Sequence, residues 1–371
     1  MKILQVISGS YPPSEGVGSH VYSLSKELVN CGHQVTIVIR RHDIKSPKYI
    51  SDSGIKVILI PILNIPFIST FLFGRDLEKR FKDCFFDIVH YHSPLVPYSN
   101  LYAKKSIVTV HSTMKVDTSF IEVISLNAIL NKVMGKLLSP IFEKALVEKC
   151  NKVVIVCEKI QEELVHAYKY KDLELTYVHN GIDKKLFQDL RVERKNQILY
   201  VGRLGYRKGI PNLLKAVGRI ATTIRKNNYT VILCGDGHLL KFCQDFIRKH
   251  SLGDVLKIVQ ESQEGVNRLY NESRYLIMNS TYETGPRTIL EAIFTGTPFI
   301  STKVGVVPTI DDRDYIPIKD FSVDSVVNAL ETAITEIDDY AFSSFQNGLA
   351  KYKSLFDNEN LTQKIVSLYE A

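Results

Sequence analysis

Two glutamates, Glu283 and Glu291, stand eight residues apart in the segment 283–291, which reads ETGPRTILE. The segment follows the apolar run 275–278, which is typical of a buried strand. Sugars and riboses present neighbouring hydroxyl groups, and a carboxylate accepts hydrogen bonds from two of them. The spacing therefore suggests a pair of acids that bind hydroxyls. A capped helix with solvated acids is the alternative that this segment leaves open.

The same segment predicts a helix N-terminus beside these acids. Gly285 and Pro286 lie between them, and Pro286 suits the first turn of a helix that begins near Arg287. The amides of Arg287 and Thr288 would then have no partner inside the helix, and such a terminus attracts anions. We therefore expect an anionic part of a ligand at this terminus.

A second loop combines glycine with two cations. The segment 201–209 reads VGRLGYRKG, with Gly202 directly after the expected strand 197–201. Arg203 supplies a rigid fork of donors and Lys208 a compact charge, so both suit a diphosphate. Cations aimed at a leaving phosphate stabilise the charge that grows on it. A basic surface turn is the alternative for this loop taken alone.

Three weaker features also follow expected strands. Gly235 lies in the sequence CGDG and Gly16 in EGVG, and either glycine would let the backbone approach a phosphate or a sugar. A lone G-x-G is a weak signal, because any tight turn between a strand and a helix can use it. His111 ends the apolar run 107–110, where it would face a ligand or serve as a structural histidine.

Neither a metal nor a redox site is expected. Asp312 and Asp314 have the D-x-D spacing of metal-dependent sugar transferases, but they lie in a charged stretch that indicates a solvated turn. No H-E-x-x-H, P-loop or G-x-S-x-G motif occurs. The six cysteines form no C-x-x-C pair, which favours reduced thiols in a cytosolic setting.

The chain of 371 residues is longer than one core usually supports, so two domains are expected. Short apolar runs alternate with helical-period segments, which is typical of βαβ units and parallel sheets. Strands are expected at 2–8, 34–40, 55–60, 87–90, 106–110, 152–156, 175–178, 197–201, 229–234, 255–259, 274–278 and 297–301. Helices are expected at 17–31, 75–83, 97–103, 125–150, 158–168, 210–226, 238–250, 264–271, 287–295 and 323–336. The charged segment 184–196 is interpreted as the linker between two doubly wound halves. Ligands of such sheets bind outside the carboxyl ends of the strands, so the site is expected in the cleft between the halves.

Charge and hydropathy point to a surface partner of the first half. The formal net charge is +7, and up to Val178 there are 22 Lys/Arg against 17 Asp/Glu. The run 57–73 is almost wholly apolar, and we interpret it as a buried strand followed by an apolar loop, with membrane contact as the alternative. The segment 126–152 reads as a basic amphipathic helix that Pro140 breaks in two. Together these features favour peripheral membrane association and a lipid-linked glycan acceptor. No aromatic and basic repeat supports nucleic acid as a partner.

Taken in chain order, these loops resemble the group 4 glycosyltransferase family of the GT-B fold. The resemblance spans nearly the whole chain and rests on GVG at 16–18, TVH at 109–111, NGID at 180–183, GR and KG between 202 and 209, GDG at 235–237, the segment 283–291, and GTPFIS at 296–301. It implies an α/β protein with two Rossmann-like domains facing across a cleft. The acceptor-side domain would be 1–178, joined by the returning C-terminal helix within 356–371, and the donor-side domain 179–355.

The resemblance also implies roles for single residues. Arg203 and Lys208 would hold the donor diphosphate, and Glu283 would contact the transferred sugar. Glu291 would hold the ribose hydroxyls, and His111 would lie near the reaction centre. The implied catalytic set is therefore Glu283, His111, Arg203 and Lys208.

The remaining donor-binding positions are glycines and the start of the expected helix. Gly16 would belong to a flexible loop near donor and acceptor, and the other positions are Gly202, Gly235, Gly285, Arg287 and Thr288. Members of the family transfer sugars with retention and without a metal or cofactor, and the leaving phosphate is thought to help deprotonate the acceptor. This chain departs from the family pattern at Glu15, Pro286, Lys303 and Val306, none of which belongs to the catalytic set.

The implied function is transfer of a hexose from a nucleotide-diphosphate sugar to a glycan or lipid-linked glycan, in the cytoplasm or at the cytoplasmic face of a membrane. A UDP-glucose donor is favoured, with GDP-mannose next. A GT-B sugar-nucleotide epimerase and a dinucleotide-dependent oxidoreductase remain alternatives. The oxidoreductase would need G-x-G-x-x-G with an acid about 20 residues later, and neither half has this pattern cleanly. A catalytically inactive scaffold is disfavoured by the intact Arg203, Lys208, Glu283 and Glu291.

Overall fold

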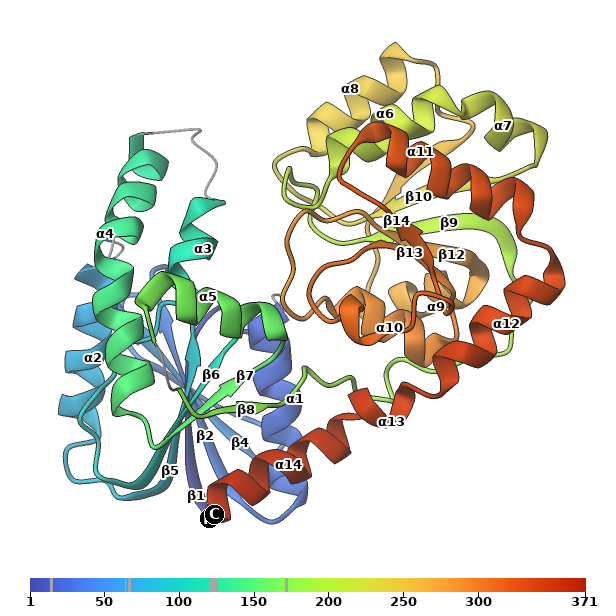
Figure 1. Ribbon diagram of the computed structural model, residues 1–371. Helices are drawn as coiled ribbons and strands as arrows, with labels where there is room; N and C mark the ends of the chain where they lie inside the picture. The colour runs from blue at the N-terminus through green and yellow to red at the C-terminus, as the bar shows by residue number, and fades with distance from the viewer. Residues whose placement is uncertain (14–15, 64, 66–67, 121–125, 171–172) are drawn as a thin grey trace. The chain divides into compact units, whose positions relative to one another are not determined.

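The chain forms two compact units, each built around one sheet (Figure 1). The computed structural model describes all residues except 14–15, 64, 66–67, 121–125 and 171–172. The first unit comprises 1–181 and 358–371, and the second comprises 182–357. All six cysteines lie in the described part, and each is a free thiol.

The sheet of the first unit has eight strands in the order β3-β4-β2-β1-β5-β6-β7-β8. Their bounds are β1 (Lys2–Ser8), β2 (Gln34–Arg41), β3 (Lys48–Asp52), β4 (Ile55–Pro61), β5 (Phe86–Ser93), β6 (Ala103–Val110), β7 (Lys152–Ile155) and β8 (Leu175–Tyr177). Every neighbouring pair is parallel except β3 with β4. The order reverses direction at β1, which is the topology of a doubly wound fold.

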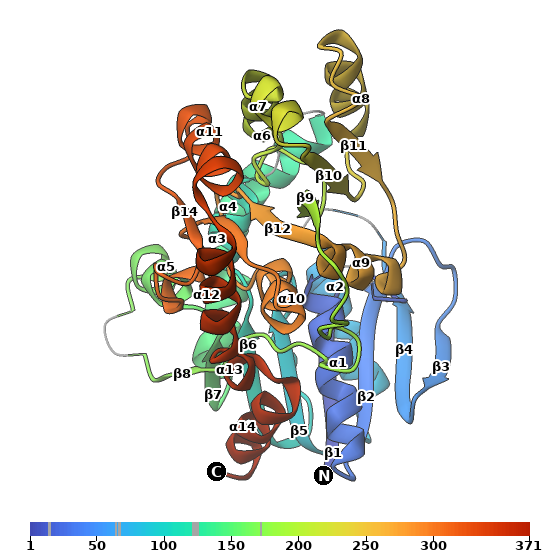
Figure 2. The ribbon, with the colours of Figure 1, turned by 90° about the vertical axis from the view of Figure 1, so that its right-hand side faces the viewer.

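Helices cover both faces of this sheet. They are α1 (Gly16–Asn30), α2 (Ile68–Arg80), α3 (Met114–Ser119), α4 (Leu126–Lys149), α5 (Glu158–Tyr168) and α14 (Asn358–Glu370). Alternate residues of each strand face opposite sides: Ile3 packs with α1 and α14, whereas Leu4 packs with α2, α4 and α5. The C-terminal helix α14 therefore returns to the first unit and lies against α1, as expected (Figures 1 and 2).

The second unit contains a six-stranded, fully parallel sheet in the order β11-β10-β9-β12-β13-β14. Its strands are β9 (Lys195–Val201), β10 (Thr230–Cys234), β11 (Leu256–Val259), β12 (Ser273–Met278), β13 (Phe299–Thr302) and β14 (Ile316–Ile318). Its α-helices are α6 (Ile210–Arg219), α7 (Ala221–Lys226), α8 (Leu240–Lys249), α9 (Gln263–Glu272), α10 (Arg287–Thr295), α11 (Val323–Glu331), α12 (Asp339–Ala350) and α13 (Lys353–Phe356). A 3-10 turn spans Val307–Thr309, and a π-helical turn spans Thr332–Glu336. The prediction of two doubly wound sheets is confirmed.

Several local predictions differ from the structure. No helix forms at 97–103, because the phenol of Tyr91 donates to the carbonyl of Ser99 and accepts from its amide, so that this backbone bonds to the core. The helix expected at 75–83 spans Ile68–Arg80 and so begins earlier. A contact distant in sequence engages its first turn, because the buried Arg40 donates a hydrogen bond to the hydroxyl of Thr70. The segment α4 is one continuous helix through Pro140, so the predicted break is absent.

The segment 184–196, interpreted as a linker, lies within the second unit. Arg194 donates to the carbonyls of Tyr270, Ser273, Thr295 and Gly296 at 2.7–3.0 Å and to the hydroxyl of Thr297 at 3.1 Å. Those contacts tie the segment to the ends of α9 and α10. The half-buried guanidinium of Arg194 thus helps to hold a charged stretch that has no apolar period.

Candidate functional site

The loops after β9 and β12 are joined through their backbones. The amide of Thr281 donates to the carbonyl of Arg207 at 2.8 Å, and Asn279 Nδ2 donates to the carbonyl of Gly209 at 2.7 Å. A Cβ atom at Gly209 would lie 2.2 Å from the carbonyl oxygen of Asn279, so only glycine permits this approach. These contacts hold the loop 201–209 against residues 279–281, which lead into the segment 283–291.

The joined loops bring together two of the predicted residues. Lys208 Nζ forms an ion pair with Glu283 Oε1. The Glu283 side chain is only 10% exposed, and that of Lys208 is 27% exposed. Arg203, on the same loop, is exposed. An ammonium, a guanidinium and a carboxylate thus gather at the carboxyl ends of two neighbouring strands.

The third loop of this edge follows β10. The amide of Gly202 donates to the carbonyl of Cys234 at 3.0 Å, and the amide of Leu204 donates to that of Asp236 at 2.8 Å. A Cβ atom at Gly235 would lie 2.0 Å from the carbonyl oxygen of Gly202. Gly235 is therefore required for the close approach of these two loops, which is a role in packing.

The helix α10 begins at Arg287, with Pro286 at its N-cap position and not in its first turn as predicted. Gly285 precedes it, and Thr288 lies in its first turn with the hydroxyl 3.9 Å from Met278 Sδ. No side chain caps this terminus. The first amides of α10 and its dipole consequently favour an anion there.

The second acid of the pair is buried one turn into this helix. Glu291 accepts a hydrogen bond from the phenol of Tyr270 at 2.9 Å and lies 3.6 Å from Arg287 Nε. Burial raises the pKa of Glu291, while Arg287 and Tyr270 act in the opposite direction. One oxygen is thus engaged by Tyr270, while the other faces the guanidinium.

In the first unit, His111 belongs to a cluster of four histidines at the carboxyl edge of the sheet. His92 and His111 stack at 5.4 Å between ring centroids, His90 lies 4.2 Å from His92, and His20 of α1 lies 5.1 Å from His111. All four side chains are buried. Gly16 starts α1 one turn before His20, is exposed, and has no neighbour close to a Cβ position, so packing alone does not require a glycine there.

Hydrogen bonds connect this cluster to the C-terminal helix. Tyr369 OH lies 2.8 Å from His90 Nδ1 and 3.3 Å from Gln5 Nε2. Gln5 Oε1 lies 2.7 Å from His92 Nε2, and His92 Nδ1 lies 3.1 Å from His111 Nε2. We call these five residues, Gln5, His90, His92, His111 and Tyr369, the histidine thread.

The order of the thread fixes where each proton resides. Because Gln5 Oε1 is an acceptor, His92 Nε2 donates, and His92 Nδ1 must accept from His111 Nε2. His111 Nδ1 then carries a lone pair and is buried, with the side chain of Asn180 near the ring. Burial lowers the pKa values of His92 and His111 well below the usual range and that of His90 to about 3, so the rings are neutral.

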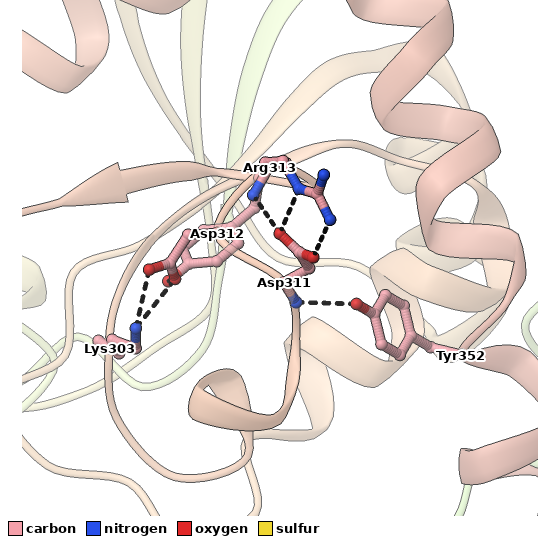
Figure 3. Close-up of polar contacts among 6 residues, drawn as sticks. Lys303, Asp311, Asp312, Arg313 and Tyr352 are labelled. Atoms are coloured by element: carbon pink, nitrogen blue, oxygen red, sulfur yellow. Dashed lines mark hydrogen bonds and ion pairs between the residues drawn. The ribbon is translucent and has the colours of Figure 1, made fainter.

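The carboxylates of the stretch 311–314 form ion pairs with nearby cations (Figure 3). Asp312 binds Lys303 Nζ at 2.9 and 3.0 Å, and Asp311 binds the Arg313 guanidinium at 2.7 and 3.0 Å. Asp314 pairs with Lys351 at 2.6 Å. No group of three or more metal-ligating side chains occurs in the described part of the chain. These carboxylates are paired with cations. The interpretation as a solvated turn holds for the exposed Asp312 and Arg313 but not for Asp314, which is buried.

Sequence reasoning named both acids, the cations and His111 as candidates, but it did not name the residues that contact them. Tyr270, Gln5 and Tyr369 carry no motif. The H-x-H spacing of His90 and His92 was an available signal, because residues two apart on a strand share a face.

Comparisons with known proteins match both parts of the chain to glycosyltransferase families. The family described as Glycosyltransferase Family 4 matches residues 14–186, and the family described as Glycosyl transferases group 1 matches residues 182–340. One subunit of the phosphatidylinositol N-acetylglucosaminyltransferase of Arabidopsis thaliana is 24% identical over 98% of this chain and 81% of its own length.

Two solved structures share the fold over the full chain. The sucrose-phosphate synthase of Thermosynechococcus elongatus superposes with a TM-score of 0.77 at 20% identity, covering 100% of this chain and 98% of its own. Anabaena HepE, solved in complex with UDP and glucose, superposes with a TM-score of 0.73 at 15% identity, covering 100% of both chains. The two family matches together span residues 14–340, and the solved structures share the fold. The chain therefore belongs to the family 4, group 1 glycosyltransferases.

Proposed function

We propose that this glycosyltransferase moves a hexose, with retention and without a metal, from a nucleotide-diphosphate sugar to a lipid-linked glycan. The observation that carries the proposal is the meeting of Lys208 and Glu283 beside the uncapped start of α10. A cation, a carboxylate and free amides there match the diphosphate and hydroxyl groups of such a donor.

Each candidate site residue of the second unit then has a role in donor binding. Lys208 and Arg203 neutralise the diphosphate, and Glu283 accepts from hydroxyls of the transferred sugar. Glu291 accepts from the ribose hydroxyls through the oxygen that Tyr270 leaves available. The amides of Arg287 and Thr288, with the loops at Gly202, Gly235 and Gly285, complete the donor site.

His111 would contribute an acceptor to the transferred sugar. Its Nδ1 lone pair, set by the histidine thread, suits a sugar hydroxyl and not a phosphate oxygen. Gly16 would allow the loop before α1 to approach the same sugar. A neutral imidazole suits this position, because a cation there would compete for the leaving phosphate.

The reaction breaks the bond between the anomeric carbon and the β-phosphate oxygen and forms one between that carbon and the acceptor oxygen. The acceptor proton passes to the departing phosphate, so no protein base is needed. Lys208 and Arg203 stabilise the charge that develops on the diphosphate. The described acids of the D-x-D stretch bind Lys303, Arg313 and Lys351, which supports a mechanism without a metal there.

The acceptor is inferred from the surface of the first unit. Five apolar side chains of α4 are exposed, namely Ile129, Leu130, Val133, Leu137 and Ile141. They lie on one face, and Ile68 and Phe71 of α2 are exposed as well. No helix in the described residues is long and apolar enough to cross a membrane. A basic, partly apolar helix suits contact with an anionic membrane, and the name of the Arabidopsis relative includes the lipid phosphatidylinositol.

Two experiments test the proposal. Thermal-shift titration with UDP, GDP, ADP and their sugars, with and without EDTA, should give a chelator-insensitive shift for one nucleotide, and we favour UDP. The absence of a shift with any nucleotide would contradict the donor site. Co-sedimentation with anionic liposomes at moderate salt tests the membrane contact, and a protein that stays in the supernatant would refute it.

A further inference from the structure

A pocket of about 430 Å³ opens between α3, α4 and α5 in the first unit. Its volume lies in the range of small-molecule sites, about 300–1,000 Å³. Four lysines line it: Lys115 from α3, Lys132 and Lys136 from α4, and Lys159 from α5. None of these residues belongs to the donor site or to the histidine thread.

The acids in this pocket leave part of its positive charge unbalanced. Glu162 is paired with Lys159 at 2.8 Å, and the buried Glu163 accepts from the hydroxyl of Thr113 at 2.5 Å. Lys115 and Lys136, by contrast, form no ion pair with any residue in the described ranges. The pocket therefore presents cations that an anionic ligand would neutralise.

The walls between these cations are mostly hydrocarbon. Val116, the methyl group of Thr118 and the aliphatic stems of the lysines form them. On α4, Val133 and Leu137 follow Lys132 and Lys136 directly in the sequence and are 50% and 64% exposed. An apolar stripe thus runs along α4 beside the cationic pocket.

We propose that this pocket binds the phosphate of an anionic lipid, whose hydrocarbon chain leaves along the exposed stripe of α4. The inference rests on the proposed function, in which the lipid carries the acceptor. Inorganic phosphate would leave the apolar walls in water, and a neutral lipid would leave Lys115 and Lys136 unpaired. A ligand with both a phosphate and a chain satisfies both parts of the pocket.

The test uses the full chain and octyl phosphate as the probe, with 1-octanol and inorganic phosphate as the two half-ligands, measured by isothermal titration calorimetry. Octyl phosphate should bind at least tenfold more tightly than either. The double variant Lys115→Glu, Lys136→Glu should weaken it at least tenfold. The matched control Lys144→Glu, Lys149→Glu makes the same change of four charge units on α4 at exposed positions outside the pocket and should keep affinity within twofold.

Equal binding of octyl phosphate by the double variant and the parent would overturn the proposal, as would equal binding of octyl phosphate and inorganic phosphate. Nucleotide binding is measured on the same samples by thermal shift and should be unchanged, which also verifies that the variants fold. Lost nucleotide binding in every sample with intact octyl phosphate binding would refute the proposed function and leave an anionic-lipid site. Intact nucleotide binding without octyl phosphate binding would refute the lipid pocket alone.

Discussion

Acidification should destabilise the first unit through its buried histidines. His90, His92 and His111 are neutral in the folded state because burial lowers their pKa values, to about 3 for His90. An unfolded histidine has a pKa of about 6.5. Below this pH the unfolded chain therefore binds protons that the folded chain does not bind. Stability is therefore unaffected well above pH 6.5 and falls as the pH drops below it.

One buried carboxyl works in the opposite direction. Glu143 accepts from the amide of Met114, at 2.9 and 3.1 Å, and from the phenol of Tyr168, and burial raises its pKa to about 7. The folded state thus takes up a proton near neutral pH, where the unfolded carboxyl does not. Its contribution to stability is present below pH 7 and is lost as the pH rises through 7.

The two effects can be compared between pH 7.5 and pH 5.5. Each histidine costs about 1.4 kcal/mol over this interval, or about 4 kcal/mol for the three, whereas protonation of Glu143 returns about 2 kcal/mol. The free energy of unfolding should consequently fall by about 2 kcal/mol. The half-buried His179, whose pKa is also lowered, adds to the loss.

The assay is urea denaturation of the full chain at pH 7.5, 6.5 and 5.5, with hydrogen exchange of peptides from β5 and β6 to isolate the first unit. His90→Gln should reduce the loss from about 2 to about 1 kcal/mol, whereas Glu143→Gln should increase it to about 4 kcal/mol. A flat profile that neither variant alters would show that the folded histidines take up protons, which refutes the reasoning.

Other substitutions probe the second unit. Arg194→Met should destabilise it by about 3–5 kcal/mol in denaturant titrations because four carbonyls and a hydroxyl lose their donor. The exposed Arg313→Met is the control, and equal effects would contradict this. Lys208→Met should lower kcat at least 100-fold, about 2.7 kcal/mol, in a sugar-transfer assay, whereas Lys215→Met on the exposed face of α6 should not. Glu291→Gln should weaken nucleoside diphosphate binding about tenfold in calorimetry, and unchanged affinity would remove this residue from the ribose site.

The repeating units of the fold could be predicted from the sequence. Strand β1 is a short apolar run that is buried almost throughout, and helix α10 is a longer, largely apolar segment that follows a Gly-Pro turn. The alternation of such segments indicates βαβ units without any knowledge of the partners. The acids Glu283 and Glu291 and the cation Lys208 were named as candidates because the segments that follow parallel strands lie at the ligand-binding edge of the sheet, and their roles remain predictions.

Only the tertiary structure decided which of these groups meet. Lys208 and Glu283 are 75 residues apart, and Gln5 and Tyr369 are 364 apart, so no local period relates them. Their contacts depend on the strand order of each sheet and on the return of α14 to the first unit. Local signals likewise failed at 97–103, where the phenol of Tyr91 binds the backbone that a helix would have used. A sequence pattern reports how deeply a residue is buried, whereas its partner is set by long-range packing.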